Sequence, residues 1–137
     1  MSAFPRMAIG AGIPRKRLYL VLLILWALLT FLLTSLPNPE MPVRFLLADK
    51  ATHLGFYGVM GLLCGLWRRA SGQTAGQAAL ETLLFIAVAG AVDEIHQNWI
   101  PGRSMEFLDW VADLLGGGAG GVFSAVLPRH FPFLLAE

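Results

Sequence analysis

The residues of this chain that could do chemistry stand mostly at the ends of long apolar segments. Lys50, His53 and Tyr57 are spaced i, i+3 and i+7, which places them on one stripe of a helix. Asp93 and Glu94 close a later apolar segment and are followed by a glutamine. A basic side chain, an imidazole and carboxylates that met in space could bind an anionic group and exchange a proton with it.

The remaining candidates follow a proline-glycine turn and enter the last apolar segment. Arg103 lies in the Pro-Gly-Arg-Ser sequence at 101–104, and its planar guanidinium suits a phosphate or a carboxylate held by two hydrogen bonds. Asp109 and Asp113 share one helical face with two glycines. The candidates for general acid/base catalysis are His53, Asp93, Glu94 and Asp109. The candidates for substrate binding are Lys50, Tyr57, Gln97, Arg103 and Asp49.

The composition predicts an integral membrane protein. Of the 137 residues, 56% are hydrophobic and 14% are charged, and the mean hydropathy is +0.65, whereas soluble domains carry roughly 25% charged residues. A soluble fold of this size could not cover its surface. This excludes a disordered chain, a nucleic-acid-binding domain with a large basic excess and most cytosolic enzymes. Cys64 is the single cysteine, so neither an internal disulfide nor a zinc cluster is expected.

Four apolar segments predict a bundle of four transmembrane helices in a single domain. The helices are expected at about 18–36, 45–67, 75–96 and 107–127 of the domain 1–137, after a basic segment at 1–17. The first has nineteen residues without a charge, which at about 1.5 Å per residue is close to the hydrocarbon thickness of about 30 Å. Proline and glycine mark the breaks between the segments.

Positive charges set the predicted orientation, because short loops rich in lysine and arginine stay in the cytoplasm. Seven basic residues fall on one side of the predicted membrane and three on the other. The first group comprises Arg6, Arg15, Lys16, Arg17, Arg68, Arg69 and Arg129, and the second comprises Arg44, Lys50 and Arg103. Both termini, including segment 1–17, are therefore expected in the cytoplasm, in a multi-pass protein of the inner (plasma) membrane.

With this topology the outer ends of the last three helices converge, and the candidate site residues gather there. An ionisable side chain in a membrane segment costs about 2.5–3.5 kcal/mol, so these groups should face one another or water. We therefore expect an outward-facing polar pocket. Glycine pairs at Gly61 and Gly65 and at Gly116 and Gly120 predict close packing within the bundle, with a homo-oligomer as the alternative. The first helix has neither a polar stripe of this kind nor a glycine pair, and it is expected to be a peripheral anchor.

An alternative interpretation assigns the same charges to structure. Lys50 and Arg103 could neutralise acids in a salt-bridge network between helices, because structural ion pairs also bury charge. Against this, six acids face three bases on the predicted outer side, more than such a network needs. Glu81 stands apart on the inner half. Glu81 could relay protons, could be protonated and lie against an amide, or could form an ion pair with Arg68 or Arg69. We favour the ion pair.

These motifs resemble the VanZ-like family of small membrane proteins. The resemblance rests on three stretches within residues 49–121: Asp49-Lys50-x-x-His53-x-x-x-Tyr57, Asp93-Glu94-x-x-Gln97-x-x-x-Pro101-Gly102-Arg103-Ser104, and Asp109 followed by Gly116 and Gly120. Asp113 departs from the family, which often has asparagine at that position. The namesake of the family is associated with resistance to teicoplanin, so the resemblance implies a function in the cell envelope and a link to antibiotic resistance.

Three functions fit these observations. The first is an enzyme that acts at the outer leaflet on an anionic cell-envelope lipid or lipid-linked saccharide, by phosphoryl transfer or hydrolysis with water or a carboxylate as nucleophile. The second is a non-catalytic protein that binds or moves such a head group, and the third is an ion- or proton-coupled carrier. Membrane lipids and a lipid-linked precursor are the expected partners, and nucleic acid is not. The sequence identifies no cofactor. A divalent cation bound by carboxylates is compatible with the first and third functions, although no cysteine or paired-histidine spacing supports one.

Overall fold

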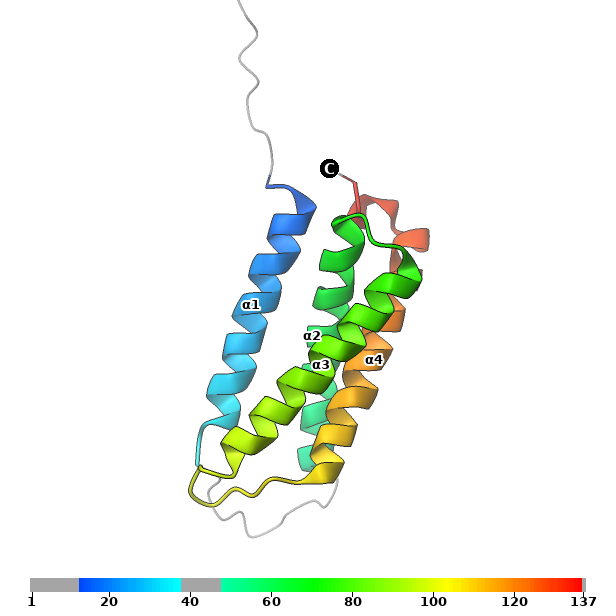
Figure 1. Cartoon of the computed structure of the whole chain (residues 1–137). Helices are drawn as coiled ribbons and strands as arrows, with labels where there is room; N and C mark the ends of the chain where they lie inside the picture. The colour runs from blue at the N-terminus through cyan, green and yellow to red at the C-terminus, as the bar shows by residue number, and fades with distance from the viewer. Residues whose placement is uncertain (1–12, 38–47, 137) are drawn as a thin grey trace, which may run out of the picture.

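The structure is a computed structural model that describes residues 13–37 and 48–136. In these two ranges the chain is all-helical, as predicted, and contains no strand. The helices are α1 (Arg15–Thr34), α2 (Ala48–Ala70), α3 (Ala75–Gln97) and α4 (Phe107–His130), followed by a short 3-10 helix η1 (Pro132–Leu134) (Figure 1). Arg6, Arg44 and the first residues of the predicted second span lie outside the described residues.

Three of the helices, α1, α3 and α4, are long and apolar enough to cross a membrane. They have 20, 23 and 24 residues, which correspond to about 30–36 Å at 1.5 Å per residue. Large apolar side chains on all three are exposed, for example Leu25, Leu84 and Leu115. These features support a membrane protein. A span by α2, which carries charged residues in both its first and its last turn, stays a prediction.

Local sequence sets where α3 begins and where two of the turns lie. The Thr74 hydroxyl accepts a hydrogen bond from the Gln77 N–H, and the Gln77 side chain accepts one from the Thr74 N–H, which completes a capping box. Gly72 and Gly102 have φ of +92° and +77°, a backbone region that glycine enters at little cost. These two glycines allow the sharp turns before α3 and before α4.

Successive helices run in opposite directions. The start of α1 and the end of α4 therefore lie at one end of the bundle, and the α3–α4 loop (98–106) lies at the other, which we call the loop end (Figure 1). Tyr19 donates a hydrogen bond to the Leu134 carbonyl oxygen at 2.8 Å and ties α1 to the C-terminal segment. Arg68 on α2 pairs with Glu81 on α3, which confirms the predicted ion pair and selects Arg68 over Arg69.

The helix α2 packs directly on α4 through glycines. A Cβ added to Gly61 would overlap the backbone of Gly117, and one added to Gly116 would overlap the backbone of Leu54. Glycine lets the two helix backbones approach this closely because it has no side chain. The prediction that the glycines serve packing within the bundle is confirmed at these contacts. The apolar core comprises Leu23, Tyr57, Met60, Cys64 and Ile86.

The glycine contact leads to a first prediction. Gly61→Ala should destabilise the protein in detergent by about 1–3 kcal/mol, because the new methyl group meets backbone atoms that cannot rotate away. Gly55→Ala is the matched control, since a Cβ there meets nothing within 4 Å and alanine favours a helix by about 1 kcal/mol over glycine. Thermal unfolding of the two variants measures the difference, and equal melting temperatures would contradict this account of the contact.

The orientation is tested by labelling thiols at two exposed loop positions, Ser71 and Ser104. In a Cys64→Ala background, a membrane-impermeant maleimide added to intact cells should modify the Ser104→Cys protein and leave the Ser71→Cys protein unmodified. The expected difference follows from the excess of positive charge at the end of the bundle that carries Ser71. Labelling of Ser71→Cys, with protection of Ser104→Cys, would reverse the predicted topology.

Candidate functional site

Four carboxylates are buried at the loop end of the bundle. Each is 3% exposed or less, and they belong to Asp93, Glu94, Asp109 and Asp113. The helices α3 and α4 carry these acids, and α2 contributes His53, which is 4% exposed. Burial of an ionised group is costly unless partners compensate it. The partners of each carboxylate therefore indicate what the site can do.

His53 links α2 to α4. Its Nδ1 lies 2.9 Å from Asp113 Oδ1 and 3.8 Å from Glu94 Oε1. Asp113 is fully buried, and its Oδ2 has no hydrogen-bond partner among the described residues. Gly90 on α3 leaves room for this oxygen, because a Cβ at that position would lie 2.8 Å from it. The imidazole and its carboxylate are thus enclosed by three helices.

Asp93 accepts hydrogen bonds from three helices. Thr34 at the end of α1 donates to Oδ1 at 2.6 Å, and Tyr57 on α2 donates to Oδ2 at 3.4 Å. Gln97, one turn further along α3, donates to the same Oδ2 at 3.4 Å. In the part of the chain that the structure describes, neutral donors and no cation contact Asp93. Asp93 therefore fixes side chains from α1 and α2 against α3.

Lys50 behaves as the salt-bridge alternative predicts. Its Nζ donates to Asp109 Oδ1 at 2.8 Å and to Glu106 Oε2 at 3.0 Å, so it joins the start of α2 to the start of α4. The Asp109 side chain is 3% exposed, and the Lys50 side chain is 26% exposed. The ammonium group that was predicted to bind a substrate is therefore engaged by two carboxylates of the protein itself.

Arg103 differs from Lys50 because its partners are neutral. Its Nε donates to the Leu36 carbonyl oxygen at 2.9 Å, and its Nη1 donates to Gln97 Oε1 at 3.1 Å. Within residues 13–37 and 48–136, no carboxylate forms an ion pair with this guanidinium. Two of its five N–H groups thus set its position, while its positive charge has no counter-ion among these residues.

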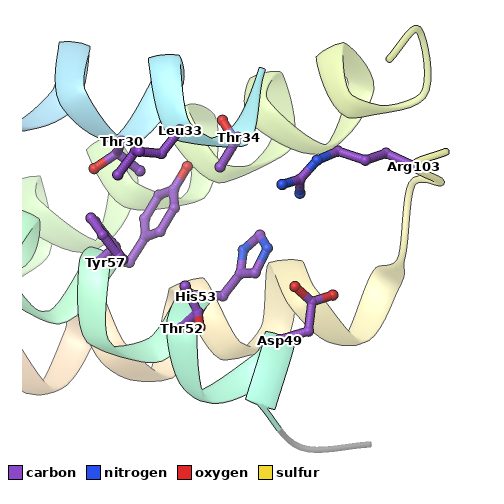
Figure 2. Close-up of a pocket in the computed structure, with 9 residues that line it drawn as sticks. Thr30, Leu33, Thr34, Asp49, Thr52, His53, Tyr57 and Arg103 are labelled. Carbon is purple, nitrogen blue, oxygen red and sulfur yellow. The ribbon is translucent and has the colours of Figure 1, made fainter. Parts of the chain in front are cut away.

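Arg103 and His53 line one pocket of about 80 Å³ between α1, α2 and the α3–α4 loop. Figure 2 shows the Arg103 guanidinium and the His53 ring pointing toward the same space, with Tyr57 on the side away from Arg103. Asp49 is exposed, whereas His53 and Tyr57 are buried, so the pocket runs from an exposed rim to a buried floor. The lining residues are Thr30, Leu33, Thr34, Asp49, Thr52, His53, Phe56, Tyr57 and Arg103.

Two parts of this site did not emerge from the sequence. The expectation that the first helix is only a peripheral anchor is wrong at its end, where Thr30 and Thr34 line the pocket and Thr34 binds Asp93. The spacing of these threonines, four apart in an apolar helix, was the available indication. Asp113 had no assigned role, yet it is the acid closest to His53. Its position four residues after Asp109 indicated the face but not the partner.

Comparison of the chain with protein-family models, with curated proteins and with solved structures finds no match. What the site can do therefore follows from its own geometry. A guanidinium without a counter-ion among the described acids and an imidazole backed by a carboxylate face the same pocket. Together they can hold a small anionic group, because the guanidinium has N–H groups left to donate and the imidazole, when protonated, donates from its second nitrogen as well.

The different partners of the two basic residues predict different effects on stability. Lys50→Ala should lower the unfolding free energy by roughly 2–3 kcal/mol, because it leaves Asp109 buried without its cation. Arg103→Ala should cost only about 1 kcal/mol, since it removes two hydrogen bonds to neutral groups. Unfolding in detergent measures both, with the exposed Lys16→Ala as control. Equal losses for Lys50→Ala and Arg103→Ala would contradict this division of roles.

Proposed function

We propose that this chain is a VanZ-like membrane protein that binds the anionic head group of a cell-envelope lipid or lipid-linked saccharide in the pocket between α1 and α2. A link to glycopeptide resistance of the teicoplanin type belongs to the same proposal. The proposal also includes the topology: α2 is the fourth membrane span, both termini lie in the cytoplasm and the loop end faces outward. The resemblance of residues 49–121 to the family motifs and the geometry of the pocket support it.

Arg103 is the observation that carries the proposal. Its guanidinium lines the pocket, its position is set by Leu36 and Gln97, and it has no ion pair with any acid in the described ranges. A side chain that is already ordered loses less freedom when a ligand binds. Its remaining N–H groups suit the paired oxygens of a phosphate or a carboxylate. The attraction is also stronger beside buried groups than in open water.

The rest of the pocket fits a charged group that is attached to an apolar chain. Leu33 and Phe56 form an apolar wall, while His53 and Tyr57 bring polar atoms to the floor. A volume of about 80 Å³ has room for several water molecules, or for one group the size of a phosphate. The apolar chain of the ligand would therefore stay in the membrane, beside the exposed leucines of α1.

Binding fits this geometry better than transport. An enzyme that uses water or the Asp49 carboxylate as nucleophile is the alternative, because Asp49 and His53 line the pocket. A carrier needs ionisable groups along its whole path, but the four buried carboxylates gather at the loop end. Glu81, on the first half of α3, is already paired with Arg68.

The proposal is tested by measuring the affinity of the purified full-length protein in detergent for dihexanoyl phosphatidic acid and for a short-chain polyprenyl phosphate. Uncharged dihexanoylglycerol is the reference ligand. Arg103→Ala should raise Kd for the phosphates at least tenfold. Among the described residues, Arg103 is the only lysine or arginine that lines the pocket, and it forms no ion pair with a carboxylate. Arg103→Lys should also weaken binding, since lysine keeps the charge but lacks the planar fork.

Arg129→Ala is the matched control, because Arg129 is exposed and lies at the other end of the bundle. This variant should bind like the wild type. Equal affinity for charged and uncharged lipids, or equal effects of Arg103→Ala and Arg129→Ala, would show that the pocket does not recognise an anionic head group.

A further inference from the structure

Beside the pocket, His53, Glu94 and Asp113 bring three ligand atoms within 4.8 Å of one another. The His53 Nδ1 lies 2.9 Å from Asp113 Oδ1 and 3.8 Å from Glu94 Oε1. Ligand atoms around a tetrahedral or octahedral ion with bonds of about 2.0–2.1 Å lie about 2.8–3.4 Å apart. The three side chains therefore stand near the spacing of ligands that share one metal ion.

The charge of the surrounding groups favours a cation at this place. Among the buried acids, only Asp109 is paired with a lysine or arginine in the described part of the chain. His53 can supply at most one positive charge to the two carboxylates of Glu94 and Asp113 that face it. Buried carboxylates without compensating charge are costly. A divalent ion between these two acids would cancel both charges.

Asp113 provides an independent indication. Its side chain is completely buried, and its Oδ2 makes no hydrogen bond to any described residue. A buried carboxylate oxygen without a donor is a costly exception in folded proteins. Its Oδ1 already lies in the group formed with His53 and Glu94. A cation bound there would compensate the whole carboxylate, including the oxygen that lacks a partner.

We propose that His53, Glu94 and Asp113 form a binding site for one divalent first-row metal ion, such as Mn²⁺ or Zn²⁺. One imidazole nitrogen with two carboxylate oxygens suits these ions, whereas Mg²⁺ and Ca²⁺ are bound mainly by oxygen. The Glu106 N–H donates to Glu94 Oε2 at 2.8 Å, which orients Oε1 toward His53. Gln97 Nε2 donates a hydrogen bond to the same Oε1 at 3.4 Å. A second lone pair of Oε1 stays available to bind a metal ion.

A second trio shares His53 and adds Asp49 and Asp109. It is the weaker candidate, because Asp109 is bound to Lys50 at 2.8 Å and the ammonium group would repel a metal ion. Asp49 is also exposed, so its carboxylate is hydrated and has little to gain from a bound cation. The buried trio lacks such a competing ammonium contact among the described residues.

The metal site is tested without any lipid, so its outcome is independent of the proposed head-group function. Full-length protein is purified in detergent, loaded by dialysis against MnCl₂ or ZnCl₂, and freed of excess metal before its content is measured by mass spectrometry. We expect about one equivalent per chain, removal of that metal by EDTA, and a fall of Tm by at least about 5 °C on removal, because ligand binding to the folded state stabilises it.

The variants Asp113→Asn and Glu94→Gln keep the size of the side chain and remove its charge. Each should lower the bound metal at least tenfold, while Asp49→Asn, which changes only the second trio, should bind as the wild type does. A wild type that holds no metal, with an unchanged Tm in millimolar Mn²⁺ and Zn²⁺, would overturn the proposal whatever the variants do. Loss of metal in Asp49→Asn with retention in Asp113→Asn would overturn it as well.

Discussion

The close contact between the backbones of α2 and α4 is the constraint on which the loop-end site depends. Glycines at Gly61, Gly116 and Gly117 leave no side chain between the two helices. His53 precedes this contact on α2, and Asp113 lies one turn before it on α4, so their 2.9 Å separation requires the helices to stay this close. A single added methyl group in the contact would move the imidazole away from its carboxylate.

The two basic side chains at the loop end, Lys50 and Arg103, have different physical roles. Lys50 and Asp109 neutralise each other between the starts of α2 and α4, which makes that pair part of the scaffold. Arg103 is held by neutral groups, so its charge remains directed into the pocket. Because an ion pair within the protein and a bound ligand compete for the same cation, only the second arrangement leaves an arginine ready for an anion.

The end of α1 completes the site although most of this helix is apolar. Thr34 donates to Asp93, and the Leu36 carbonyl oxygen accepts from Arg103, so the same short segment touches α3 and the α3–α4 loop. The pocket therefore combines an apolar wall, Leu33 of α1 with Phe56 of α2, and a polar floor from His53 and Tyr57 of α2. This contrast between an apolar wall and a polar floor suits a ligand that has both characters.

The sequence by itself determined the helical class and the approximate helix limits, because both depend on local periodicity. It limited the basic partner of Glu81 to Arg68 or Arg69 and favoured packing within the bundle for the glycines, and the structure selected Arg68 and the α2–α4 contact. Only the tertiary structure decided that Lys50 binds acids of the protein while Arg103 does not. It also decided that Thr34 enters the site. These outcomes depend on how far each helix is rotated and shifted against its neighbours, since a shift of a few ångströms exchanges one partner of a long side chain for another. Spacing along one helix carries no information about that offset.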